Sequence, residues 1–148
     1  MRVSVIQMDV VKGDRQANYK TVRRLVERAV SHASPDAVVL PELWSTGYAL
    51  DDCNRQASPE GEQDAAFLGE LAQQYGVSFA GGSVLSIRAD GKVTNRAQII
   101  DHKGRCVAVY DKIHLFRLMQ EDLFLEPGKS PLWFEMHQMH CAAVICYD

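Results

Sequence analysis

The first forty residues contain two short apolar runs separated by a long amphipathic stretch, and this alternation restricts the fold more than any other feature. Residues 3–8 predict a buried strand. Apolar residues then recur at helical spacing over residues 15–32, where Asp14 can cap the helix and Ser34-Pro35 can end it. Residues 37–40 predict a second strand, buried on both faces. A strand, a helix and a strand in this order form a βαβ unit, so the two strands should be parallel.

A second helix is predicted after a loop. Ser58 can act as its cap, Pro59 suits its first position, and Gly76 suits its end. Residues 77–80 then predict a third strand. The chain therefore continues the α/β pattern.

The rest of the chain predicts consecutive strands. Turn residues separate three strand candidates, which together predict an antiparallel meander: residues 83–88, 97–101 and 106–110. A long loop over residues 112–130 and two last strands, residues 132–134 and 141–145, follow. The sequence thus predicts one α/β domain with a mixed sheet.

Composition and charge argue against several classes of protein. A length of 148 residues suits one domain, and 47% apolar with 24% charged residues is ordinary for a globular protein. The net charge is −3 and basic residues are dispersed, so we expect no nucleic-acid partner. No apolar run approaches the ~18–20 residues that span a bilayer, and no signal peptide is evident, so we expect no membrane and a cytoplasmic location. In the cytoplasm the four cysteines should be reduced thiols. Their spacing gives no CxxC pair, so we expect neither a disulfide framework nor a structural zinc site.

Three chemically useful side chains follow predicted strands. Glu42 lies beyond residues 37–40, Lys112 lies beyond residues 106–110, and Cys146 ends the strand of residues 141–145. Open α/β sheets bind ligands beyond the carboxyl ends of their strands. A carboxylate, an ammonium and a thiol are therefore candidates for one site.

This trio can be assigned a chemistry. A neighbouring base or cation makes a thiol nucleophilic, a partly buried glutamate can act as general base, and an ammonium can stabilise an oxyanion. We expect Lys112 to favour the Cys146 thiolate, so that Cys146 reacts with iodoacetamide faster than the other cysteines. Each residue also has an ordinary structural role: Glu42 and Lys112 as solvated turn residues, and Cys146 as a small buried hydrophobe. Cys141 should face away from Cys146 and lie in the core.

Three segments resemble the motifs of the nitrilase superfamily of carbon–nitrogen hydrolases. Residues 41–48 (PELWSTGY) are similar to its glutamate motif, residues 111–116 (DKIHLF) to its lysine motif, and residues 144–148 (VICYD) to its cysteine motif. The order of the motifs and their rough separations agree. The resemblance covers essentially the whole chain, including residues 3–7 and 80–83.

The resemblance implies a four-layer α-β-β-α sandwich without a cofactor or metal, and hydrolysis of a non-peptide C–N bond. It implies that Cys146 is the nucleophile, Glu42 the general base and Lys112 an oxyanion stabiliser, with the backbone N–H of Tyr147 as a second donor. Glu121 matches a second glutamate of the superfamily, which holds the lysine and helps to position substrate. It could also belong to a plain acidic loop.

Residues 43–48 and 114–121 look closest to the omega-amidase branch, which deaminates 2-oxoglutaramate or similar 2-oxo acid amides. Arg117 lies in the right loop to meet a substrate carboxylate, although an exposed arginine is the commoner role. Superfamily members continue past the cysteine motif into a region used in dimer contacts. We therefore expect residues 1–148 to be the N-terminal portion of a single hydrolase domain whose C-terminal part is absent from this chain, with the full-length protein a homodimer or higher homo-oligomer.

Three alternatives remain open. The same trio could serve an N-carbamoyl amidase or a true nitrilase. The chain could instead be a truncated, inactive member that acts as a binding module. A metal hydrolase using His137, His140 and Cys141 lacks the helical setting and carboxylate base of a known zinc motif. His114 could titrate near neutrality, although a structural hydrogen bond is its commoner role.

Overall fold

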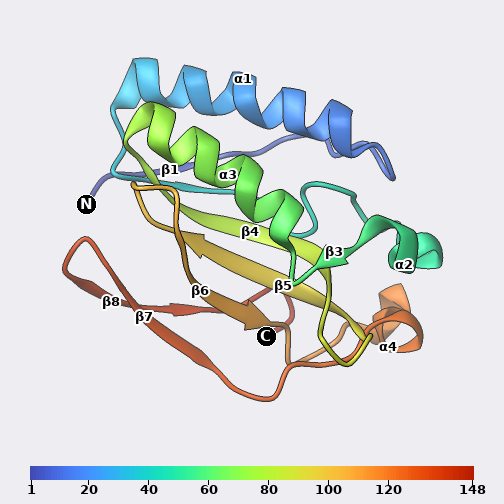
Figure 1. Cartoon of the computed structure of the whole chain (residues 1–148). Coiled ribbons are helices and arrows are strands. Elements are labelled where there is room, and N and C mark those ends of the chain that lie inside the picture. The colour runs from blue at the N-terminus through green and yellow to red at the C-terminus, as the bar shows by residue number, and fades with distance from the viewer.

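The structure is a computed structural model that describes residues 1–148, and it has three layers: helices, a large sheet and a two-stranded hairpin (Figure 1). The helices are α1 (Arg15–Ala33), α2 (Cys53–Gln56), α3 (Glu62–Tyr75) and α4 (Glu121–Phe124), with two 3₁₀ turns, η1 (Leu50–Asp52) and η2 (Arg117–Met119). The strands are β1 (Val3–Val5), β2 (Ala37–Val39), β3 (Ser58–Pro59), β4 (Ser78–Ile87), β5 (Val93–Ile100), β6 (Cys106–Asp111), β7 (Leu132–Met136) and β8 (Met139–Ala143).

The large sheet is mixed, as the sequence predicts. Its order is β1-β2-β4-β5-β6, and β3 pairs with the far end of β4. Strands β1, β2 and β4 are parallel, whereas β5 is antiparallel to both β4 and β6. Strands β2 and β6 therefore run in the same direction, and their carboxyl ends lie at the same edge of the sheet.

Helices α1 and α3 lie side by side on one face of this sheet (Figure 1). The Asp14 side chain accepts a hydrogen bond from the N–H of Ala17, and Ser34 ends α1 in a left-handed conformation. Apolar residues of the helices and strands form the largest core cluster, with 14 buried residues that include Val22, Trp44 and Phe79. The prediction of an amphipathic helix after the first strand is confirmed.

Two predicted element boundaries are wrong because of local turns. Ser58 and Pro59 form the short strand β3 instead of starting a helix, and α3 begins at Glu62 after a left-handed turn at Gly61. The Ser58 hydroxyl still accepts a hydrogen bond from the N–H of Gln63, so it caps the helix from a distance. Residues 77–80 and 83–88 are not separate strands, because a bulge between Ala80 and Ser83 lets β4 run through both.

Gly82 in this bulge allows a close approach of two chain segments. It has a φ of +60°, and a Cβ atom there would lie 2.1 Å from the carbonyl oxygen of Pro41. A larger residue would therefore push away the segment that carries Glu42.

The hairpin β7–β8 covers part of the opposite face of the large sheet (Figure 1). Two further expectations change here. Strand β8 ends at Ala143, so Cys146 lies three residues beyond a strand of a separate sheet. Strand β1 is an edge strand in which Val5 is 74% exposed, and it is not buried as predicted. None of the helices has the length and apolar character that crossing a membrane requires.

Candidate active site

Glu42 follows β2 and is held by the neighbouring strands. The next two residues are anchored to β4, because the N–H of Leu43 donates to the hydroxyl of Ser83 and the N–H of Trp44 donates to its carbonyl. The side chains of Leu43 and Trp44 are fully buried. These contacts fix the backbone on one side of Glu42 and leave its carboxylate 15% exposed.

Lys112 follows β6, and its ammonium is enclosed by two carboxylates. Its Nζ lies 2.7 Å from Oε1 of Glu42 and 3.0 Å from the carboxylate of Glu121. Lys112 and Glu121 are both completely buried. The loop after β6 folds back so that Glu121 also accepts a hydrogen bond of 2.7 Å from the N–H of Phe116. The predicted association of Glu121 with Lys112 is present in the structure.

Gly128, which the sequence places near the end of this loop, holds the loop against Lys112. Its N–H donates to the carbonyl of Lys112 at 2.8 Å. A Cβ atom at Gly128 would lie 2.0 Å from the carbonyl oxygen of Asp111, so the contact requires glycine.

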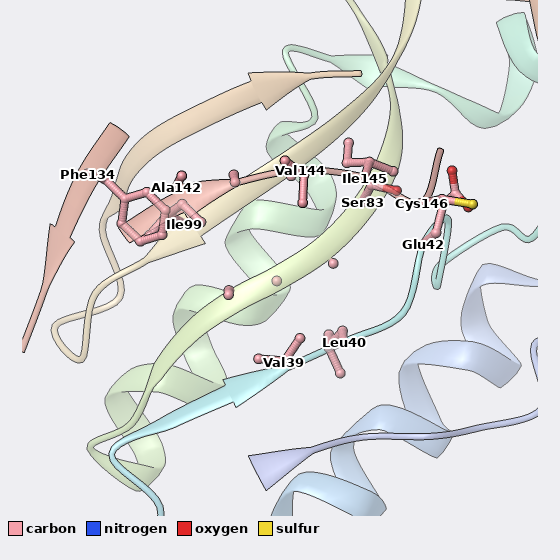
Figure 2. A pocket seen from close by; sticks show the side chains of 15 residues that line it. Val39, Leu40, Glu42, Ser83, Ile99, Phe134, Ala142, Val144, Ile145 and Cys146 are labelled. Atoms are coloured by element: carbon pink, nitrogen blue, oxygen red, sulfur yellow. The ribbon is translucent and has the colours of Figure 1, made fainter. Parts of the chain in front are cut away.

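Cys146 lies in a turn after the hairpin and shares a cavity with Glu42. The cavity has a volume of about 310 Å³ and lies between β2, β4 and β5 on one side and the segment around β8 on the other. Its walls are mostly apolar. Figure 2 shows Glu42 and Cys146 at the same end of it, with Phe134 and Ile99 toward the other end.

The electrostatics assign a protonation state to each group. Burial alone would raise the pKa of Glu42, but hydrogen bonds from Lys112, Tyr48 and Asn95 lower it below its ordinary value. Burial would lower the pKa of Lys112, but its bonds to Glu42 and Glu121 raise it. At neutral pH the site therefore holds an ionised carboxylate beside a protonated amine.

The thiol behaves differently from the expectation. Its partial burial and the negative charge of Glu42 raise the pKa of Cys146, and these effects outweigh the opposite influence of Lys112. Lys112 does favour the thiolate, as expected, but burial and Glu42 have the larger combined effect, so the pKa of Cys146 lies above its ordinary value. The resting state pairs a neutral thiol with a carboxylate that can accept its proton.

Other candidates lie outside this cluster. Arg117 is exposed, lies 3.7 Å from Asp122 and lines a separate hollow. His137 contacts the hydroxyl of Ser78 and the carbonyl of Asp36, while His140 is exposed, so these histidines and Cys141 do not form a metal-binding group. Cys141 is partly buried and packs beside a small core cluster.

Three residues near the site have no role in the sequence-based hypothesis. The Tyr48 hydroxyl donates to Oε2 of Glu42, and the Asn95 amide donates to its Oε1 at 2.9 Å. Asp148 binds the segments on both sides of Lys112. Three sequence features could have pointed to these residues: an asparagine inside a buried strand, a tyrosine within the glutamate motif and an aspartate within the cysteine motif.

The sequence model of the family described as carbon-nitrogen hydrolase matches residues 2–148. The chain belongs to the carbon–nitrogen hydrolase family. Among curated family members, a 2-oxoglutaramate amidase of Bacillus subtilis is 36% identical over 146 residues, which cover 99% of this chain and 55% of the relative. A protein named nitrilase from Pyrococcus abyssi is 32% identical over 155 residues, covering 100% of this chain and 56% of that protein.

A solved structure in the same superfamily has the same fold. The crystal structure of Saccharomyces cerevisiae Nit3, a member of branch 10 of the nitrilase superfamily, matches with a TM-score of 0.89 at 24% identity. The match covers 99% of this chain and 55% of Nit3. The chain thus has the mixed α/β fold of the nitrilase superfamily and spans little more than half the length of the relatives it matches.

Proposed function

We propose that this chain carries the catalytic residues of an amidase that hydrolyses the amide of a small carboxylic acid and releases ammonia. One observation carries the proposal: a thiol and an ionised carboxylate line one cavity, and a buried ammonium lies 2.7 Å from that carboxylate. A cavity of about 310 Å³ is of the size that small-molecule ligands occupy. Membership of the carbon–nitrogen hydrolase family gives the reaction class.

In the first half of the proposed reaction, the sulfur of Cys146 attacks the amide carbon while Glu42 accepts the thiol proton. The electron pair of the carbonyl moves onto its oxygen. Lys112 has a third N–H besides the two that its carboxylate partners accept, and this N–H together with the N–H of Tyr147 stabilises the oxyanion. Glu42 then protonates the nitrogen, the C–N bond breaks, and ammonia leaves a thioester on Cys146.

In the second half, Glu42 takes a proton from water as the water oxygen attacks the thioester carbon. The C–S bond breaks, the acid leaves, and the sulfur regains a proton from Glu42. Glu121 holds Lys112 throughout, because its buried carboxylate lies 3.0 Å from the ammonium. The cycle uses no cofactor and no metal.

We propose a 2-oxo acid amide as the substrate, on the support of the 36% identical 2-oxoglutaramate amidase. Ammonia release from a 2-oxo acid amide, a carbamoyl amine and a nitrile tests this. The 2-oxo acid amide should react fastest. If it is inert while another compound reacts, the substrate is wrong and the reaction class stands; if all three are inert, the amidase proposal fails.

A nitrilase is the second candidate, because the relative at 32% identity bears that name. The same nucleophile, base and ammonium would act on a C≡N carbon. Acid formation from the nitrile without reaction of the amide would favour it. An inactive binding module would hydrolyse none of the compounds.

Location and assembly remain proposals. All four cysteines are free thiols in the structure, which suits a reducing compartment, and we propose the cytoplasm. We also propose that the complete protein is a homodimer or higher homo-oligomer and that residues 1–148 are the N-terminal portion of its domain. The intact mass and solution mass of the natural protein test both statements.

A further inference from the structure

We propose that Asp148 is the positioning residue that holds the nucleophile's turn against the segment that carries Lys112. The expected effect on kcat rests on the proposed amidase function. The expected effect on the position of Cys146 does not depend on that function. Asp148 does not line the cavity that Cys146 and Glu42 share. It would act through the position of Cys146.

The Asp148 carboxylate is almost fully enclosed, with 4% of its side chain exposed, and it has four hydrogen-bonding partners. Oδ2 accepts from the hydroxyl of Tyr110 at 2.8 Å and from the N–H of Ile145 at 2.9 Å. Oδ1 accepts from the N–H of His114 at 2.8 Å and lies 3.1 Å from its ring Nδ1. These contacts hold the carboxylate in one position, because each of its oxygens has two hydrogen-bonding partners.

The turn that Asp148 closes has a strained backbone. The N–H of Asp148 donates to the carbonyl of Ile145 at 3.1 Å, so residues 145–148 form a tight turn. Within it Cys146 has a φ of +49°, a left-handed conformation that residues other than glycine rarely adopt. Strain of this kind persists only where surrounding contacts impose it. The bond from Ile145 to Asp148 supplies such a contact directly before Cys146.

The partners of Asp148 flank Lys112 closely. Tyr110 precedes Lys112 by two residues, and His114 follows it by two. The ring of Tyr147 also packs on the ring of Phe116, with centroids 5.2 Å apart. The turn therefore contacts the loop that follows Lys112 at a second point. Asp148 therefore sets the distance between the element that delivers the thiol and the element that delivers the ammonium.

The protonation states of Tyr110 and Asp148 favour these hydrogen bonds. Burial and the hydrogen bond to Asp148 raise the pKa of Tyr110 to about 12, so its hydroxyl keeps the proton that it donates. Burial would raise the pKa of Asp148, but its hydrogen bonds from His114, Ile145 and Tyr110 lower it. Near neutral pH Asp148 is therefore ionised and Tyr110 is protonated, so the hydrogen bond between them is kept.

The test compares Asp148→Asn with Asp101→Asn. Asp101 is a matched control, because its carboxylate also accepts two backbone N–H bonds, from Lys103 and Arg105 at 2.9 Å, but in the turn between β5 and β6. For Asp148→Asn we expect kcat on the 2-oxo acid amide to fall about 10²-fold with KM changed less than about 3-fold, since a displacement of ~1 Å costs that much. Asp101→Asn should leave both constants unchanged.

The second readout is the pH dependence of iodoacetamide labelling at Cys146, measured by peptide mass spectrometry. Release of the turn should move the thiol away from Glu42, so its labelling midpoint should shift to lower pH in folded Asp148→Asn. A loss of stability alone would not move this midpoint. If wild-type protein hydrolyses none of the amides, the amidase proposal fails, and the labelling midpoint still tests the position of Cys146.

Tyr110→Phe is a milder second variant, for use if Asp148→Asn does not fold. It removes only the hydrogen bond from the Tyr110 hydroxyl to the Asp148 carboxylate. We expect a shift of the Cys146 midpoint in the same direction and a smaller fall in kcat. A wild-type midpoint and kcat in folded Asp148→Asn, or in Tyr110→Phe where Asp148→Asn does not fold, would overturn the proposal. Equal effects of Asp148→Asn and Asp101→Asn would also overturn it.

Discussion

Lys112 and Cys146 both interact with Glu42, but they reach it from very different surroundings. Lys112 and Glu121 are completely buried, and their charges are paired within the fold. Cys146 lies in an exposed turn whose neighbours Val144 and Tyr147 are 71% and 63% exposed. Glu42 and Lys112 therefore follow strands of the large sheet, whereas a short turn after the β7–β8 hairpin places the thiol that we propose as the nucleophile.

This difference separates two kinds of dependence. A buried ammonium between two carboxylates is part of the stability of the fold, because removal of one partner leaves uncompensated charge. A thiol in an exposed turn contributes little to stability. Substitutions in the two regions should therefore have different effects on unfolding and on activity.

The largest effect should follow from Lys112→Ala. The carboxylates of Glu42 and Glu121 would remain buried without their cation, which typically costs about 3–5 kcal/mol. We expect the free energy of unfolding to fall by that amount and amide hydrolysis to be lost. Urea titration measures the first, and Lys103→Ala, on an exposed turn, is the control with a change within about 0.5 kcal/mol. Equal stability of the two variants would mean that the buried cluster is not a structural element.

A smaller effect concerns the stability of the charged region at low pH. The pKa of Glu42 is lower in the folded protein than its ordinary value of 4.5. Its ionised form therefore stabilises the fold above about pH 4.5, and this contribution is lost as the pH falls through the lower folded pKa. Urea midpoints of wild type and Glu42→Gln should differ at pH 7 and converge below pH 4.5. A constant difference over this range would contradict the direction of the shift.

The smallest effect concerns the thiol in the same variant. The charge of Glu42 helps to raise the pKa of Cys146, so Glu42→Gln should increase the thiolate fraction. We expect iodoacetamide labelling of Cys146 at pH 7.5 to accelerate by up to about tenfold, since one pKa unit changes the thiolate fraction tenfold. Labelling of Cys141 in the same sample is the internal control. A slower reaction of Cys146 would show that Glu42 favours its thiolate.

The same contrast explains how much the sequence could predict. Periodicity located α1 and β2, and the rule that sites form beyond strand ends found Glu42 and Lys112 in one sheet. The rule does not describe Cys146, because β8 ends at Ala143 in a separate sheet. Spacing along the chain cannot tell which sheet a strand joins.

Other errors have local physical reasons. The bulge at Gly81-Gly82 resembles a break between strands, although β4 continues through it. Proline after serine resembles a helix start, but a left-handed turn at Gly61 delays α3. The bonds from Tyr48 and Asn95 to Glu42 depend on tertiary contacts that no sequence pattern specifies.

The central claim is that an acyl group is transferred to the sulfur of Cys146 while Lys112 and Glu42 stabilise the transition state. Mixing the protein with a 2-oxo acid amide and quenching with acid during the first turnover tests it by mass spectrometry. We expect an acyl adduct on the peptide that contains Cys146, together with one equivalent of ammonia, and neither product from Cys146→Ala. Amide hydrolysis by Cys146→Ala, or turnover through an adduct on another residue, would contradict the account.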